Sequence, residues 1–414
     1  MTTPRAIHAD AIVTGDREAL LDAAVIVDAR GEVIDVGAAS DVLSLHAGVT
    51  VERVRGVVMP GLVNAHTHLE LSALRGKVTG GAGFVKWVER MMGVRSEEMP
   101  EENVEAIDAA IDELDAAGTV AVGEVTNSLA AVRALARRGF AGCVFHEVFG
   151  VTSEAVRAKI DELDAQVSSR LGTWPSLDLA YAPAPHTLYT THADAVRQLV
   201  AAARAAHRMT TLHLAEHASE RRALESGDGP IADWYERMLK LPRAEIAWPR
   251  VSPVAYADQL GALAPHVVVV HLADARGDEL ELVAKRGSPV VLCPRSNLHI
   301  EARLPPLLAV RAAGIEAALG TDSLASNASL DVLAEARALA DRFPSVPARE
   351  LVQMATWNGA RALGRDDLGR VAKGARPGLV AIDGDVGADP CAFVLRNVRA
   401  PRRFVARRAP EKES

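Results

Sequence analysis

The two ends of the chain share a texture of short apolar runs that alternate with polar positions. Near the start, AIVTG is followed by AAVIVDARGEVIDVGA, in which Arg30 and Gly31 separate two β-branched runs as in a hairpin turn. The same texture returns near the end, in GLVAIDGD and in AFVLRNVRAPRRFVARR (392–408). Because no helix-length periodicity interrupts either part, we expect one small β-sandwich domain built from residues 1–57 and 367–408.

Between these ends, eight short apolar runs each finish in polar or charged residues, and most precede a stretch with helical periodicity. In order, the runs are VVMPGLVNAHTH, GTVAVGEVTN, GFAGCVFHEVFG, LDLAYAPAPH, TTLHLAEH, HVVVVHLAD, PVVLCPRSN and IEAALGTDS. Gly118, Gly139 and Gly314 stand where the intervening helices should end. Strands that alternate with helices predict an α/β fold, a (β/α)8 TIM barrel over residues 58–366, with catalytic groups at the carboxyl ends of its strands.

Composition narrows the functional classes. The 414 residues are 49% hydrophobic and 24% charged, which is typical of a folded globular protein large enough for a barrel with an accessory domain. A net charge of -8 without a dense Lys/Arg block argues against nucleic acid and membrane surfaces as partners. Scattered cysteines, no apolar leader and no membrane-length apolar run favour a cytoplasmic location. Residues 409–414 form a polar tail.

Potential metal ligands collect at the ends of the predicted strands. His66 and His68 close the first run, and side chains two apart on a strand face the same side, so both can bind one ion. His213 ends the fifth run and Asp322 ends the eighth. Three imidazoles and one carboxylate form a donor set that suits Zn(II), with Fe(II) or Mn(II) left open. We therefore predict one divalent metal ion bound by these four residues.

Three residues are predicted to handle protons and charge beside this ion. Glu216 stands three residues after His213 in HLAEH, which places it near the ion without binding it and suits a proton shuttle. His271, at the end of the sixth run, is expected to orient the attacking water or to stabilise charge at the attacked carbon. Asp322 is also expected to accept a proton from that water. The alternative for Glu216 and His271 is a capping or supporting role.

Together these motifs resemble the amidohydrolase superfamily and, within it, the branch of metal-dependent deaminases and chlorohydrolases. The resemblance rests on PGLVNAHTHLELS (60–72), APAPHTLYT (182–190), LHLAEH (212–217), VVHLAD (269–274), LCPRSNLHI (292–300) and LGTDSLASN (319–327). It implies a mononuclear metal barrel that hydrolyses an aminated or halogenated heterocycle, with His186 reaching the substrate from the fourth strand. Binuclear relatives use a lysine at the end of that strand, whereas this chain has PAPH there.

The segment after the first strand, HTHLELSALRG followed by GGAGFVKWVERMMGVR, is most similar to the aminodeoxyfutalosine deaminases of that branch. The similarity implies hydrolytic deamination of a purine nucleoside-like substrate, 6-aminodeoxyfutalosine, in menaquinone biosynthesis. The candidate substrate-binding residues are Phe84 and Trp87 for the flat ring, Glu70, Glu97 and Glu98 for ribose hydroxyls, and Arg295, Arg75 and Arg90 for a carboxylate on the substrate tail. For the two aromatic residues the alternative is helix packing on the barrel, for the three glutamates it is a surface or supporting position, and for Arg295 it is a structural ion pair.

Other functions would use almost the same parts. A chlorohydrolase, or a deaminase of guanine, cytosine or S-adenosylhomocysteine, would need the same ligands and the same shuttle. A catalytically silent scaffold is a hypothesis of a different class, but such a protein should have lost ligands, and none is missing here. The expected partner is a small aminated heterocycle, with no nucleic acid or membrane, and a homodimer is the candidate assembly.

Overall fold

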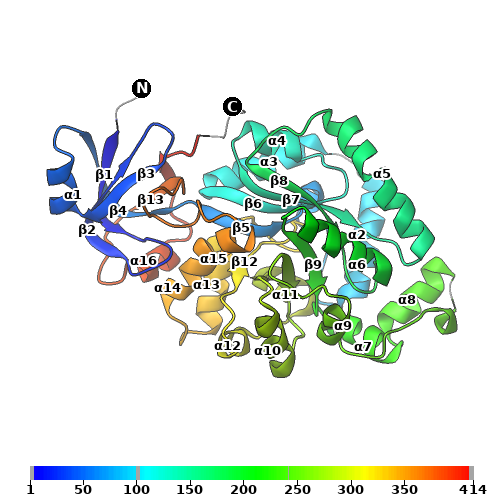
Figure 1. Cartoon of the computed structure of the whole chain (residues 1–414). Coiled ribbons are helices and arrows are strands. Elements are labelled where there is room, and N and C mark those ends of the chain that lie inside the picture. The colour runs from blue at the N-terminus through cyan, green and yellow to red at the C-terminus, as the bar shows by residue number, and fades with distance from the viewer. Residues whose placement is uncertain (1–3, 99–102, 241, 410–414) are drawn as a thin grey trace.

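The two ends of the chain pair in one sheet. In the computed structural model, which describes residues 4–98, 103–240 and 242–409, six strands hydrogen-bond in the order β14-β13-β4-β1-β2-β3 (Figure 1). Their bounds are β1 Arg5–Ile12, β2 Leu20–Val27, β3 Val33–Ala38, β4 Thr50–Pro60, β13 Leu379–Asp383 and β14 Arg403–Ala406. Strand β4 runs parallel to β1 and antiparallel to β13. Segments from opposite ends of the sequence therefore share one hydrogen-bonded ladder.

This sheet confirms one detail of the sequence prediction and corrects two. The turn at Arg30 and Gly31 joins antiparallel strands β2 and β3, and Gly31 has a φ of 77°. However, the described strands of both ends form a single sheet instead of a sandwich of two, because β4 bonds to both β1 and β13. The predicted strand at 392–408 is also shorter than expected: Pro390–Arg396 form helix α16, with Asp389 as its N-cap and proline in its first turn.

The middle of the chain supplies eight parallel strands in two four-stranded sheets, β5-β6-β7-β8 and β12-β11-β10-β9. Each of the eight predicted runs contains one of them: β5 Leu62–Thr67, β6 Thr119–Thr126, β7 Ala141–Val148, β8 Leu179–Pro185, β9 Thr210–Leu214, β10 Val267–His271, β11 Val290–Leu292 and β12 Ala318–Leu319. Single parallel bridges, Thr67 with Asp322 and Thr187 with His213, join the two sheets at both seams. The α/β prediction is thus confirmed, and the strands follow one another in chain order.

Helices connect these strands and cover their outer side (Figure 1). Gly118, Gly139 and Gly314 have φ values of 81°, 74° and 76°, which supports their predicted place after helix ends. The helical segments are α1 Ala39–Leu45, η1 Leu69–Leu74, α2 Phe84–Glu98, α3 Val104–Ala116, α4 Val132–Arg137, α5 Ser153–Leu171, α6 Ala193–Ala205, α7 Ala218–Ser226, α8 Pro230–Leu239, η2 Arg243–Glu245, α9 Pro253–Gln259, α10 Gly277–Arg286, α11 Pro294–Glu301, α12 Leu307–Ala312, α13 Val332–Arg342, α14 Ala348–Met354 and α15 Trp357–Ala362.

The end sheet and the parallel strands share a hydrophobic core. Val57 and Met59 of β4 and Val380 of β13 belong to the same buried cluster as Val269 of β10 and Leu319 of β12. The boundaries between the small domain and the barrel therefore stay a prediction, because β4 contributes to both. Among the described residues, no helix combines the length and the apolar character that crossing a membrane requires.

Candidate metal centre and active site

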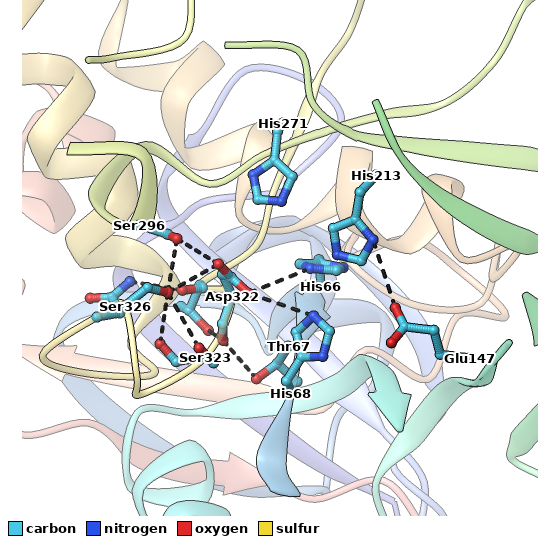
Figure 2. Close-up of polar contacts among 12 residues, drawn as sticks. His66, Thr67, His68, Glu147, His213, His271, Ser296, Asp322, Ser323 and Ser326 are labelled. Carbon is cyan, nitrogen blue, oxygen red and sulfur yellow. Dashed lines mark hydrogen bonds and ion pairs between the residues drawn. The ribbon is translucent and has the colours of Figure 1, made fainter. Parts of the chain in front are cut away.

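The four predicted metal ligands come together at the carboxyl ends of the parallel strands (Figure 2). His66 lies near the end of β5, His68 just after it, His213 in β9 and Asp322 after β12. The ring centroid of His66 lies 4.9 Å from that of His68 and 4.9 Å from that of His213. Side chains from distant parts of the sequence therefore face one small volume, as expected of the catalytic end of a barrel.

Asp322 is oriented by hydroxyls on one side and faces imidazoles on the other. Ser296 and Ser326 donate to its Oδ2 at 2.5 and 3.0 Å. Its Oδ1 turns toward His66 and His68, whose Nε2 atoms lie 3.8 and 3.6 Å away. Burial acts to raise the pKa of this carboxyl, but the facing imidazoles, His66 first among them, outweigh burial and hold the pKa well below its usual range. Asp322 therefore offers an ionised oxygen to the centre.

The imidazoles offer lone pairs that no described side chain uses. His66 Nε2 is buried and has no hydrogen-bond partner in the described part of the chain. Burial lowers the pKa of His66 and of His213 to about 3, so both rings are neutral near pH 7, as metal binding requires. Potential ligand atoms of His66, His68 and Asp322 lie within 4.8 Å of one another, and those of His66, His213 and His271 do as well. This donor set fits a divalent ion.

The backbone around the centre adopts uncommon conformations. The φ angles of Ala215, His271 and Asp322 are 48°, 80° and 57°, a region that residues other than glycine seldom enter. At Asp322 the backbone N–H donates to the carbonyl of His66 at 3.1 Å. Gly320 makes this approach possible, because a Cβ there would lie 2.6 Å from the Cβ of His66. Contacts between strands therefore hold the site residues in place.

Glu216 and His271 face each other beside the ligand cluster. His271 Nε2 lies 3.7 Å from Glu216 Oε1, and both side chains are buried. Asn297 Nδ2 donates to Nδ1 of His271 at 3.3 Å, which leaves the ring proton on Nε2, on the side of Glu216. Burial, and after it the charges of Asp322 and Glu220, raises the pKa of Glu216 well above its usual range. A raised pKa favours the protonated form of the carboxyl, which suits a group that delivers a proton.

Glu220, which the sequence analysis missed, holds Glu216 in place. In the first turn of α7, its carboxylate accepts the backbone N–H groups of Ala215 at 3.1 Å and of Glu216 at 2.8 Å. The next residue, Arg221, donates to the carboxylate and the carbonyl of Asp274, just after β10, at 2.6 and 2.7 Å. One helical turn thus links the strand ends that carry Glu216 and His271. The sequence feature that could have revealed Glu220 is an acidic residue four positions after Glu216, at the start of a helix.

His186 lies where the family resemblance expects a substrate contact. Its carbonyl accepts hydrogen bonds from the backbone N–H of His213 at 3.0 Å and from that residue's Nδ1 at 3.1 Å. Its side chain is 28% exposed, and its ring meets that of Phe149 edge-on at a centroid distance of 6.2 Å. His186 therefore stands at the accessible side of the cluster, and its substrate role stays a prediction.

Glu70 is engaged by a neighbouring loop. Its carboxylate accepts from the Thr126 hydroxyl at 3.0 Å, from the Asn127 backbone at 3.1 Å and from the Ser128 hydroxyl at 2.8 Å. These bonds fix the turn that follows β6. These bonds agree with the supporting position considered as the alternative for Glu70, and its contact with ribose hydroxyls stays a prediction.

The three arginines considered for a substrate carboxylate also bond elsewhere. Arg295 lies 3.5 Å from the fully buried carboxylate of Glu335, in agreement with the structural ion pair considered as its alternative role. Arg75 forms an ion pair with Glu113. Arg90 donates hydrogen bonds to the backbone carbonyl and the hydroxyl of Thr79, before α2. The cation that would recognise a substrate carboxylate is therefore not identified among these three.

Helix α2 covers one edge of the site. Trp87 is 6% exposed and packs in a cluster with Leu74, Val78, Ile300 and Ala325, which agrees with the packing alternative for this residue.

At the start of the same helix, the Phe84 ring stacks on that of His217 with centroids 3.9 Å apart. His217 in turn is the N-cap of α7. The side chains of Glu97 and Glu98, at the other end of α2, lie outside the described residues.

Glu147 is a second site residue that the sequence analysis missed. From β7, its Oε1 lies 3.8 Å from His213 Nδ1 (Figure 2). The same oxygen lies 3.9 Å from His186 Nε2. The sequence feature that could have revealed Glu147 is the end of the third apolar run, HEVFG, which places a carboxylate near the end of a strand. The preceding histidine, His146, points to the other face, where its Nδ1 bonds the Tyr181 hydroxyl at 3.0 Å.

Comparison with known proteins places the chain in a family. Residues 57–406 match the Amidohydrolase family, so the chain belongs to that family and the resemblance drawn from the motifs is confirmed. The chain is accordingly a metal-dependent hydrolytic enzyme, and the curated relatives described next are deaminases.

Two curated relatives and one solved structure are similar to this chain over most of its length. The chain is 33% identical over 324 residues to the aminodeoxyfutalosine deaminase of Deinococcus radiodurans, covering 76% of this chain and 75% of that protein. It is 33% identical over 376 residues to the 5-methylthioadenosine/S-adenosylhomocysteine deaminase of Halobacterium salinarum, covering 88% and 80%. Its fold matches Helicobacter pylori aminofutalosine deaminase in complex with methylthio-coformycin, with a TM-score of 0.86, 22% identity and coverage of 99% and 100%.

Proposed function

We propose that this enzyme hydrolyses the 6-amino group of the adenine ring in a modified adenosine, with aminodeoxyfutalosine as the preferred substrate and menaquinone biosynthesis as its setting. The observation that carries the proposal is the buried carboxyl of Glu216, 3.7 Å from His271, beside a set of histidines and one aspartate. The 33% identity to an aminodeoxyfutalosine deaminase supports the choice of substrate.

The ligands of one divalent ion, zinc by the nature of the donor set, would be His66, His68, His213 and Asp322. Iron or manganese is the alternative. When bound, the ion would supply Lewis acidity that lowers the pKa of water toward neutrality. The unpartnered His66 Nε2 and the neutral state of the buried rings support this assignment.

The remaining chemistry falls to side chains of the chain itself. Glu216 would donate its proton to the ring nitrogen beside the amino-bearing carbon, which makes that carbon electrophilic. The Nε2–H of His271 would stabilise negative charge that develops at the attacking oxygen. Asp322 would accept a proton from water, and Glu216 or Asp322 would then pass a proton to the leaving ammonia. Water and the amine thus give the oxo purine and ammonia, without a further reactant.

The metal assignment is tested by elemental analysis of the purified protein. We expect about one zinc per chain, and loss of both metal and activity in His66→Ala, His68→Ala or Asp322→Ala. His8→Ala, in β1 of the end sheet, is the matched control and should keep both. Two equivalents bound with equal affinity would contradict the single-ion assignment.

The substrate is tested by release of ammonia and loss of the adenine absorbance band across a panel of substrates. The panel contains aminodeoxyfutalosine, S-adenosylhomocysteine, 5-methylthioadenosine, adenosine, guanine, cytosine and a chlorinated triazine. We expect kcat/KM for aminodeoxyfutalosine to exceed that of each other compound. Faster turnover of guanine, cytosine or the triazine would move the enzyme to another group of the family and leave the metal assignment intact.

A second candidate is a 5-methylthioadenosine deaminase. The relative from Halobacterium salinarum aligns over more of this chain, 88% against 76%. In addition, the three arginines considered for a substrate carboxylate are bonded elsewhere, which favours a substrate without that group. A higher kcat/KM for 5-methylthioadenosine than for aminodeoxyfutalosine would select this candidate.

A further inference from the structure

Glu147 places a buried carboxylate oxygen between two histidines of the site without a hydrogen bond to either. Its side chain is 8% exposed, and Oε1 is buried and unpartnered in the described part of the chain. Its Oε2 accepts from Asn127 Nδ2 at 3.4 Å, and the same nitrogen donates to the Glu147 carbonyl at 3.1 Å. Asn127 thus steadies one side of the carboxylate and leaves Oε1 facing the histidines.

The first of these histidines, His213, carries its ring proton on the side of Glu147. Its Nδ1 lies 3.1 Å from the carbonyl oxygen of His186. A carbonyl oxygen only accepts hydrogen bonds, so Nδ1 must be the donor and Nε2 keeps its lone pair. That lone pair is the one available to the cluster of His66, His68 and Asp322.

The second histidine, His186, also presents an N–H to Glu147. Thr187 Oγ1 accepts the backbone N–H groups of Tyr189 and Thr190 at 3.3 and 3.0 Å, so its own proton goes to Thr190 Oγ1 at 2.8 Å. The Thr190 hydroxyl then donates to His186 Nδ1 at 2.7 Å. With Nδ1 as an acceptor, the proton of the neutral ring is on Nε2, which lies 3.9 Å from Glu147 Oε1.

We propose that Glu147 is a positioning residue, a buried carboxylate whose Oε1 faces the N–H groups of both His213 and His186 and stabilises the orientation of both rings. The two separations exceed an ordinary hydrogen bond by less than about 1 Å, so a small side-chain rotation brings Oε1 into range of either ring. Through His213 the carboxylate holds a predicted metal ligand. Through His186 it holds the ring that faces the accessible side of the site. This inference rests on the metal centre proposed above.

The same proton positions argue against a second metal ion between Glu147, His186 and His213, although potential ligand atoms of the three lie within 4.8 Å of one another. Both nitrogens that face Glu147 carry protons, so neither has a lone pair for a metal. Lys159 instead supplies a positive charge nearby: its ammonium lies 3.4 Å from the centroid of the Phe149 ring, and the charge of Glu147 opposes the lowering of the Lys159 pKa by burial.

Two measurements test the role of Glu147, and neither uses a substrate. In the wild-type protein labelled with nitrogen-15 histidine, long-range nitrogen–proton spectra report which ring nitrogen carries the proton, with peaks assigned from His186→Gln and His213→Gln. We expect the proton on Nδ1 of His213 and on Nε2 of His186. A proton on Nδ1 of His186, or on Nε2 of His213, would overturn the proposal whatever the variants show.

The second measurement is zinc affinity, by competition of the intact protein with a chromophoric chelator. Glu147→Gln keeps the shape but has one neutral acceptor, so we expect the zinc dissociation constant to rise about 10-fold or more, while the ring protons, which the His186 carbonyl and the Thr190 hydroxyl place, keep their positions. Glu154→Gln, which removes one exposed carboxylate from the first turn of α5, should change neither. Unchanged zinc affinity in Glu147→Gln would refute the role. Because substrate is absent, a wrong substrate assignment leaves both readouts valid.

Discussion

The environment of Glu216 determines which chemistry this single side chain can perform. It is 7% exposed, faces the Nε2–H of His271 and lies in the field of Asp322. Burial and nearby negative charge both favour the protonated carboxyl. A group that must give up and recover a proton works best when its pKa lies near the operating pH, and this environment moves Glu216 in that direction.

Replacement of Glu216 with glutamine should separate proton transfer from metal binding. The amide has the same shape but no acidic proton, so we expect turnover to fall by at least about 100-fold while the bound metal is retained. Steady-state kinetics and elemental analysis of the same preparation check both parts. Turnover close to that of the wild type, with metal bound, would reject the assigned role.

His217 makes stability depend on pH without being a predicted metal ligand. Burial lowers its pKa from 6.5 to about 3, so between these pH values the unfolded chain binds a proton that the folded chain does not. Its stabilising contribution is therefore complete above pH 6.5 and is lost as the pH falls toward 3. In urea unfolding at several pH values, His217→Asn should lose less stability than the wild type as the pH falls from 7 to 4, by up to about 1.4 kcal/mol per pH unit. Asparagine retains an N-cap acceptor for α7. Equal pH slopes for the two proteins would show that His217 is not the group responsible.

Among the secondary-structure elements, α7 has the clearest effect on the site. Its first turn uses Glu220 to bind the backbone at Ala215 and Glu216, and Arg221 to bind Asp274 after β10. Strands set the spacing of the site residues, but the chain leaves β9 and β10 through residues with positive φ, Ala215 and Leu272. Helix α7 supplies the hydrogen bonds that hold the backbone after these strands in place.

Glu220→Gln should therefore impair catalysis through the position of Glu216. An amide can accept only at its oxygen, so one of the two backbone N–H groups is left without its acceptor, at a cost of about 1–3 kcal/mol in unfolding free energy. We expect kcat to fall about 10-fold with KM and metal content nearly unchanged, a size comparable to the loss of other supporting hydrogen bonds around catalytic groups. Glu225→Gln, on the same helix and 37% exposed, is the control and should behave like the wild type. An unchanged kcat in Glu220→Gln would show that the strand end holds Glu216 without the helix.

In the whole molecule, ion pairs tie the end sheet to the barrel. Arg408, after β14, donates to the carboxylate of Asp178 at 2.6 Å, and both side chains are nearly fully buried. Arg365 also contacts Asp178, at 3.5 Å. These contacts, together with the core shared by β4 and the parallel strands, indicate that the two parts unfold together. We propose that residues 1–57 with 367–408 form one structural domain and residues 58–366 the other. We do not expect the two domains to unfold separately.

Removal of the Arg408 guanidinium should destabilise the entire protein. Arg408→Ala removes the 2.6 Å ion pair of the buried Asp178 carboxylate, so we expect a loss of about 3 kcal/mol in unfolding free energy, in a single transition. The adjacent Arg407 is 57% exposed and pairs with Asp115 at the surface, so Arg407→Ala should cost less than about 1 kcal/mol. Denaturant unfolding followed by circular dichroism measures both. Equal losses, or two separate transitions, would contradict this link between the parts.

The sequence alone determined the features that depend on local pattern. Alternation and helical periodicity located all eight parallel strands and the hairpin at Arg30, because side-chain direction repeats with the geometry of each element. Residues at strand ends identified His66, His68, His213 and Asp322, because the carboxyl ends of parallel strands meet at one face. Periodicity could not foresee helix α16, where an Asp-Pro cap overrides an apolar run, or the pairing that makes one sheet from both ends.

Only the tertiary structure decided which polar side chains contact one another around the site. Glu70 and Arg295 lie near site motifs in sequence, yet hydrogen bonds direct their side chains into neighbouring loops. Glu147 and Glu220 carry no recognisable motif, yet strand register and helix capping place their carboxylates against His213 and Glu216. The physical reason is that a strand end fixes where a Cα lies, whereas hydrogen-bond partners far away in the sequence fix where a long polar side chain points.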